Sequence, residues 1–167
     1  MVLITLTKGM RQYSQIRYLR INLLNMAKKK KYTLTFDQEF DFDMIGVCSH
    51  HSDYRLVWNI NKKIGLQLAK SNEDYVIMNK KGEVVSNYSM YEYKDEIDRL
   101  TYYLIKNKNH GNYLIPEKPT IDYFLFLHDN YAVNAKQLMS ELKAVPSVLG
   151  VYDFDPYDIE SAENIVF

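Results

Sequence analysis

Short strand-like segments separated by turn signals fill the middle of this chain, and they constrain its fold more than any other feature. Residues 66–127 consist largely of runs rich in β-branched and aromatic side chains. Gly82 and Gly111 lie in two of the breaks between these runs, where a glycine can take the positive φ that a tight turn needs. The succession predicts antiparallel strands.

A helix is expected before these strands, at residues 52–65. Ser52 or Asp53 is a suitable N-cap, and Gly65 is a suitable stop. The apolar residues that we expect on its buried stripe are Tyr54, Val57, Trp58 and Ile64.

A second helix is expected near the C-terminal end, at residues 130–146. Asn130 would cap it and Pro146 follows its end. Strand-like segments flank this helix, and a strand–helix–strand unit can place its two strands parallel in one sheet. The fold class that we predict is α+β. It is a single domain with a mostly antiparallel sheet of about six to seven strands, two helices on one face and a C-terminal βαβ-like unit.

Residues 32–44 alternate between apolar and polar side chains, which predicts one long strand with a buried and a wet face. The wet face carries four carboxylates. Calcium binding is disfavoured because side chains two apart lie in a line and no loop wraps an ion. We expect this face to be solvated or to meet a basic partner.

The net charge of zero hides an asymmetry between the two ends of the chain. Residues 1–31 carry eight basic side chains and no acidic one. This composition fits a nucleic-acid-binding arm or a transit peptide, but a natural translation start at Met26 is the simpler interpretation. We therefore expect 1–31 to be a basic extension, disordered or not native, 32–155 to be the domain, and 156–167 to be an acidic, loosely held tail.

The composition also limits the cellular setting. A single cysteine, Cys48, excludes an internal disulfide. No apolar run is long enough for a membrane span, so we expect a soluble cytoplasmic protein without a membrane partner. The fifteen tyrosines suit half-buried positions on a sheet, where the ring packs and the hydroxyl reaches water.

A Pro-Glu-Lys-Pro break separates two strand-like runs at residues 113–129. Pro116 cannot donate to a ladder, and Pro119 forces the preceding lysine into an extended conformation. We expect a rigid turn in which Asp122 accepts hydrogen bonds from the turn's own free N–H groups, while Glu117 lies on the exposed limb.

The same stretch, "IPEKPTIDY" at residues 115–123, resembles the signature of the bacterial IPExxxVDY family, with Ile121 in place of valine. Residues 40–46, 53–68 and 102–108 are also similar to that family, so the likeness covers about 32–127. The family is functionally uncharacterised, and the resemblance therefore implies membership and no active residues. The motif residues, whose role is unknown, are Ile115, Pro116, Glu117, Ile121, Asp122 and Tyr123.

One dense polar cluster lies before and within the start of the first helix. Its members are Cys48, His50, His51, Asp53 and Arg55. With His110 or His128 the cluster could hold a metal, but zinc sites usually have a second ligand pair at short spacing, and we expect no metal. Nothing marks Cys48 as an ionised nucleophile, and we expect Arg55 to pair with acidic side chains rather than to bind a phosphate.

Catalytic motifs are absent from the sequence. There is no phosphate-binding glycine loop, paired-cysteine motif or nucleophile elbow. Glu117 and Asp122 could act as an acid and base pair, yet a surface glutamate and a turn-capping aspartate need no function. We therefore expect neither an enzyme nor a bound cofactor.

Three functions fit these observations, in order of preference. The first is a protein-interaction or adaptor module, because tyrosines are common interface anchors. The second is a metabolite-sensing regulatory α+β module, by analogy of fold alone. The third is RNA binding through the basic N-terminal segment, which requires residues 1–31 to be native. The sequence does not indicate an oligomeric state.

Overall fold

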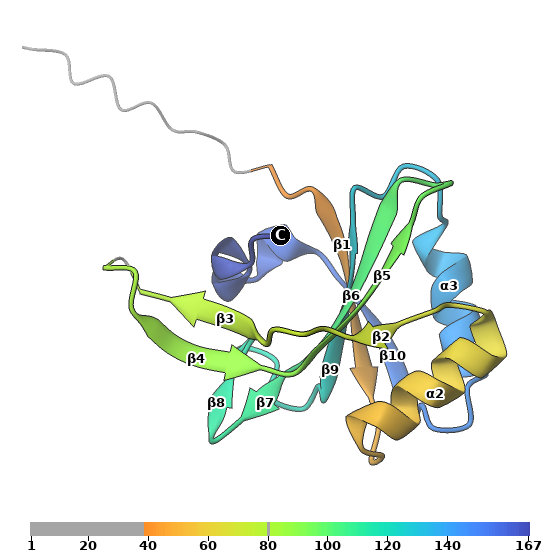
Figure 1. Ribbon diagram of the computed structural model, residues 1–167, viewed down its shortest axis with the longest axis horizontal. Coiled ribbons are helices and arrows are strands. Elements are labelled where there is room, and N and C mark those ends of the chain that lie inside the picture. Colours follow the sequence, from red (N-terminus) through yellow and green to blue (C-terminus); the bar gives the residue numbers. More distant parts are fainter. Residues whose placement is uncertain (1–38, 80) are drawn as a thin grey trace, which may run out of the picture. The chain divides into compact units, whose positions relative to one another are not determined.

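The computed structural model describes residues 39–79 and 81–167 (Figure 1). They form the α+β domain that the sequence predicts, with two helices and a mostly antiparallel main sheet. The expected basic extension and the start at Met26 lie outside the described residues.

The main sheet has six strands in the order β10-β1-β9-β6-β5-β2, and all neighbours are antiparallel. Its strands are β1 (Phe42–Cys48), β2 (Ala69–Lys70), β5 (Met90–Asp95), β6 (Leu100–Lys106), β9 (Tyr123–His128) and β10 (Gly150–Phe154). Two small ribbons accompany it: β3 (Tyr75–Met78) with β4 (Val84–Tyr88), and β7 (Lys108–Asn109) with β8 (Asn112–Tyr113). Gly82 and Gly111 take positive φ in the ribbon turns, as expected.

The C-terminal crossover is confirmed, with one strand inserted in it. Strands β9 and β10 are joined by α3 (Ala135–Lys143), and both are antiparallel to β1, which lies between them. They are therefore parallel to each other. The expected cap was wrong by one turn, since Asn134 caps α3 by accepting from the N–H groups of Lys136 and Gln137. Asn130 instead closes the preceding turn through Val133.

Helix α2 (Asp53–Ile64) begins after Ser52 and ends at Gly65, which takes a left-handed conformation, as predicted. The predicted stripe was wrong in part. Its buried residues are Leu56, Val57 and Ile60. Tyr54 and Trp58, which the sequence suggested for the core, are exposed.

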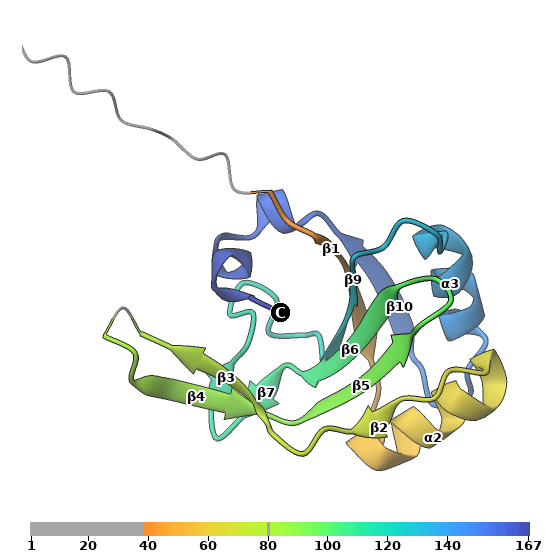
Figure 2. The same ribbon diagram turned by 45° about the horizontal axis from the view of Figure 1, so that its top comes forward.

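Both helices pack on the same face of the sheet, as Figure 2 shows. Alternate residues of the strands face them, because side chains alternate across a strand. The core on this side includes Ile45, Val47, Leu104, Leu125, Leu127, Leu56, Ile60, Leu138 and Leu142. The β3–β4 ribbon, the motif and the C-terminal segment contribute to a second core, which includes Met44, Phe124, Phe126, Ile105, Ile115, Ile121, Tyr75, Tyr88 and Ile165.

The expected long strand at 32–44 is wrong in its described part. Strand β1 begins only at Phe42, and residues 1–38 lie outside the described residues. The acidic face is not simply solvated either. Asp41 bonds His128 at 3.1 Å, and Asp43 accepts from the Asn130 side chain at 2.6 Å. Two carboxylates of the expected acidic face are therefore hydrogen-bonded to side chains from a later part of the chain.

The C-terminal segment is packed, in contrast to the loosely held tail that we expected. It forms two 3₁₀ helices, η1 (Pro156–Asp158) and η2 (Glu160–Asn164). Ile159, Ala162 and Ile165 are buried in the second core. No helix among the described residues has both the length and the apolar character for crossing a membrane.

Candidate functional site

The motif at 115–123 and the polar cluster at 48–55, which are far apart in sequence, meet in the fold. A carboxylate oxygen of Asp122 accepts from the backbone N–H of Ser49 at 2.8 Å. The hydroxyl of Tyr123 donates to the carbonyl oxygen of His51 at 3.1 Å. The motif therefore holds the segment 49–52, from which α2 starts.

These contacts correct the expected role of Asp122. The Asp122 carboxylate accepts a hydrogen bond from the segment before α2 and not from the N–H groups of its own turn. The side chain that organises the turn is Asn107, which is fully buried at the end of β6. Its amide donates to the carbonyls of Lys118 and Ile121 at 3.0 and 2.8 Å. Its side-chain oxygen accepts from the N–H of Ile115 at 2.9 Å. The sequence offered no signal for this asparagine, because its partners lie on the other side of a hairpin.

Glu117 also differs from expectation. It is exposed, but its carboxylate accepts from the N–H of Ser161 at 2.8 Å and from the Ser161 hydroxyl at 2.6 Å. Burial tends to raise the pKa of Glu117, but the hydrogen bonds from Ser161 and from its own backbone N–H, together with the charge of Lys118, outweigh it and hold the pKa below its ordinary value. The motif thus contacts η2 at one end and the start of α2 at the other.

The remaining motif residues serve packing. Ile115 and Ile121 are buried in the second core, and Pro116 is exposed. Ile121 lies over Gly46 of β1, where an added Cβ would come within 3.2 Å of it.

The Cys48 cluster is not assembled as a ligand set. The thiol of Cys48 donates to the carbonyl of Thr120 at 3.5 Å. Burial, followed by the charge of Asp122, raises the pKa of this thiol, which disfavours the thiolate that a nucleophile needs. The carboxylate of Asp53 accepts from the Ser89 hydroxyl at 3.0 Å. Arg55 is exposed and forms no ion pair with a described residue, so its expected acidic partner is not found there.

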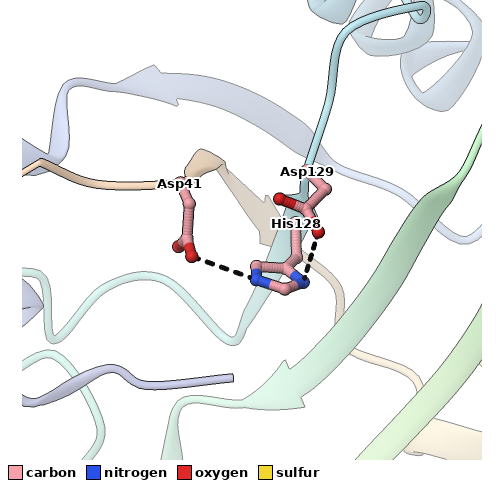
Figure 3. Close-up of side chains that lie close together, drawn as sticks. All are labelled: Asp41, His128 and Asp129. Atoms are coloured by element: carbon pink, nitrogen blue, oxygen red, sulfur yellow. Dashed lines mark hydrogen bonds and ion pairs between the residues drawn. The ribbon is translucent and has the colours of Figure 1, made fainter.

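A different trio has the spacing of metal ligands (Figure 3). Among the residues that the structure describes, Asp41, His128 and Asp129 alone bring three such ligand atoms within 4.8 Å of one another. Nε2 of His128 lies 3.1 Å from Asp41, and Nδ1 lies 3.8 Å from Asp129. A carboxylate beside each ring nitrogen can orient the imidazole. These residues could hold a divalent ion.

The imidazole borders an open groove on the sheet face opposite the helices. The groove has a volume of about 870 Å³, and its lining includes Glu92, Lys94, Arg99, Tyr103 and His128. Arg99 and Asp129 both have positive φ at its rim. The mixture of charges gives the groove no single preference for anions or cations.

The exposed side of α2 forms the most distinctive surface. We call Tyr54, Arg55, Trp58 and Lys62 the α2 face; all four side chains are exposed. The exposed fractions of Tyr54 and Trp58 are 69% and 59%, and the ammonium of Lys62 lies 4.7 Å above the Trp58 ring. The sequence did contain a signal, because Leu56 and Ile60 share a helix side that excludes Trp58.

Neither the protein-family models nor the curated proteins contain a match to this chain.

Proposed function

We propose that this protein is a non-enzymatic, cytoplasmic protein-interaction module of the IPExxxVDY family, which binds an acidic segment of a partner protein through the α2 face. The observation that carries the proposal is Trp58, the single tryptophan of the chain, lying exposed on the outer side of a rigid helix. The exposed apolar surface of a tryptophan is unfavourable in water, and a partner that buries this surface gains the corresponding free energy.

The composition of the α2 face supports this proposal. Tryptophan, tyrosine and arginine are the side chains that most often carry the binding energy of an interface. Tyr54, Arg55 and Trp58 lie within about one helical turn of each other. Their apolar rings can fill pockets while the cations stay at the rim.

The charges of the face indicate an acidic partner. The face carries Arg55 and Lys62 and no carboxylate. Neither cation is engaged in an ion pair among the described residues. A partner segment that bears carboxylates could form a charge-assisted hydrogen bond with the guanidinium of Arg55.

The motif supports the same function indirectly, by holding the helix in place. Asp122 and Tyr123 fix the segment that precedes α2, and Leu56 and Ile60 anchor its inner side. A face that is already ordered before binding loses little conformational entropy when it binds.

The small number of cations disfavours nucleic acid as the ligand of this face. Arg55 and Lys62 are its only two, whereas binding to a phosphate backbone rests on many Lys and Arg contacts. RNA binding would depend on the basic residues 1–31, which lie outside the described residues.

The experiment is affinity capture from the native cell, followed by direct titration of the captured protein with fluorescence of Trp58 as the readout. We expect its emission to shift to the blue on binding, and binding to weaken with salt. Trp58→Ser and Arg55→Glu should abolish capture. Tyr131→Ser, which changes a tyrosine before α3 that is even more exposed, should not.

Three outcomes would contradict the proposal. Capture that survives both α2 variants would place the interface elsewhere. Loss of capture after nuclease treatment would favour RNA. A melting-point increase with one class of metabolite, with no captured protein, would favour ligand sensing in the groove beside His128.

A further inference from the structure

A second open groove lies where β1 begins, beside the end of β10 and the start of η1. We call it the aromatic groove. Its volume is about 450 Å³, within the range of about 300–1,000 Å³ that is typical of small-molecule sites. It shares no lining residue with the groove beside His128, and no residue of the α2 face lines it.

Four aromatic rings line the aromatic groove: Phe40, Phe42, Phe154 and Tyr157. The rings of Phe40 and Phe42 meet at 61°, with their centroids 5.4 Å apart. The rings of Phe40 and Tyr157 meet at 79° and 4.9 Å. Rings at such steep angles form a corner that presents more than one π-face, and these faces attract cations. Tyr157 is 66% exposed, so a ligand can reach this corner.

Carboxylates supply the charge of the aromatic groove. Asp43, Asp153 and Asp155 line it, and its described lining contains no basic side chain. The rings and the carboxylates therefore favour the same kind of ligand, because both attract a cation. An anion would meet three like charges at close range.

One ring of the aromatic groove already has a cation against it. The ammonium of Lys118 lies 5.0 Å from the centroid of the Phe154 ring. The chain itself thus places an alkylammonium on a wall of the groove, which is the contact that a cationic ligand would make with the other rings.

The hydrogen bonds of the carboxylates favour a methylated cation over a primary ammonium. Asp43 already accepts from the side-chain amide of Asn130 at 2.6 Å, and Asp155 accepts from the N–H of Tyr157 at 3.0 Å. A primary ammonium is strongly hydrated and brings three N–H donors that need acceptors. A quaternary ammonium keeps the charge without any donor, and aromatic rings are its usual binding partners.

We propose that the aromatic groove binds a small molecule with a quaternary ammonium head, which rests against Phe40, Phe42 and Tyr157 beside the three carboxylates. The site is independent of the proposed function, because the α2 face lies on another element.

Isothermal titration calorimetry of the full chain with choline tests the proposal. The matched ligand is 3,3-dimethylbutan-1-ol, in which an uncharged tert-butyl group replaces the trimethylammonium head. We expect choline to bind saturably at one site and the neutral isostere to bind at least about tenfold more weakly, because only the charged head gains from the ring faces and the carboxylates.

Variants then locate the site. Phe40→Leu and Tyr157→Leu keep an apolar side chain but remove a ring, and each should raise the dissociation constant of choline about tenfold. Tyr157 is exposed, so Tyr157→Leu provides the test even if Phe40→Leu fails to fold. Tyr113→Leu is the control, because Tyr113 carries the ammonium of Lys108 at 5.5 Å but lies outside the aromatic groove. It should leave the dissociation constant unchanged.

A second pair of variants tests the charge. Asp153→Asn should raise the dissociation constant about threefold, as expected for an exposed charge. Asp158→Asn, which neutralises an exposed acid of η1 outside the lining, should not.

Four results would overturn the proposal. The first is a wild-type chain that shows no saturable choline binding, and the second is equal binding of choline and its neutral isostere. The third is a dissociation constant that Tyr157→Leu leaves unchanged, because the cation would then bind elsewhere. The fourth is tighter binding of phosphatidylcholine vesicles than of choline, which would make a membrane and not a small molecule the source of the head group.

Discussion

The carboxylate of Glu117 accepts both the backbone N–H and the hydroxyl of Ser161, at 2.8 and 2.6 Å. This contact joins the motif to η2, across 44 residues of sequence. Ser161 lies in the first turn of η2, so the glutamate caps this helix from a distant segment. The glutamate of the motif therefore has a structural partner.

Glu117→Ala should lower the free energy of unfolding by about 1 kcal/mol, since it removes a charged acceptor from two donors that remain near solvent. Urea unfolding measures this. Glu160→Ala, which also removes an exposed carboxylate from the first turn of η2, is the matched control and should change little. Equal effects of the two variants would show that the loss of charge alone matters.

Acid should weaken the same contact. The folded-state pKa of Glu117 lies below its ordinary value of 4.5, so its contribution is complete above that pH and is lost as pH falls through the folded pKa. We expect Glu117→Gln to show a smaller loss of stability below pH 4.5 than wild type. Urea midpoints at a series of acid pH values test this, and parallel curves for the two proteins would contradict it.

Asn107→Ala should be the most damaging polar substitution around the motif, at about 3 kcal/mol, because it leaves the buried carbonyl of Ile121 and the N–H of Ile115 without this partner and removes one of two hydrogen bonds to the Lys118 carbonyl. Asp122→Ala, which removes one exposed acceptor from Ser49, should cost about 1 kcal/mol. Chemical unfolding of both variants provides the comparison. A larger loss of stability in Asp122→Ala would mean that the exposed bond of Asp122 to Ser49 stabilises the motif more than the buried bonds of Asn107 do.

The sequence predicted the elements better than the contacts between them. Strand and helix positions follow from alternation, caps and turn glycines, which are local, and so α2 and the ribbons lie where they were expected. The packed tail and the late start of β1 were missed, because they depend on distant partners. Ile165 is buried in the second core, whose members come from distant segments, and no local pattern predicts that environment.

Gly46→Ala should destabilise the fold by about 2 kcal/mol, because the new methyl group would lie 2.6 Å from the Phe154 ring and 3.2 Å from Ile121. Thermal unfolding gives the measurement. Gly65→Ala tests a different cause, because nothing lies near its Cβ position and only its positive φ opposes the substitution. If Gly46→Ala unfolds like wild type, the β1–β10 packing can relax without cost.

Alkaline pH should destabilise the protein through Tyr102. Burial, reinforced by Asp95, raises its pKa from 10.0 to about 12. The neutral phenol is therefore favoured in the fold, and its contribution is complete below pH 10 and is lost as pH rises toward 12. Tyr102→Phe should show a smaller loss of stability over this interval in urea titrations. If stability falls with pH equally in Tyr102→Phe and in wild type, the loss comes from other tyrosines, such as Tyr123.

The candidate surfaces were only partly accessible to sequence reasoning. The resemblance at 115–123 located a segment that the fold does use, but Asn107 and Ser161, its main partners, carry no local signal. Trp58 was placed in the core because aromatic residues usually mark the apolar side of a helix.

The position of β1 between β9 and β10 has a consequence for biosynthesis. Met44 pairs on one side with Phe126 and on the other with Phe154, so β1 has no strand neighbour until the last third of the chain has left the ribosome. Helix α2 and strands β5 and β6 can form earlier, from local contacts. An apolar strand thus waits unpaired through most of translation, which makes ribosome-bound chains that stop before residue 150 the species most in need of a chaperone.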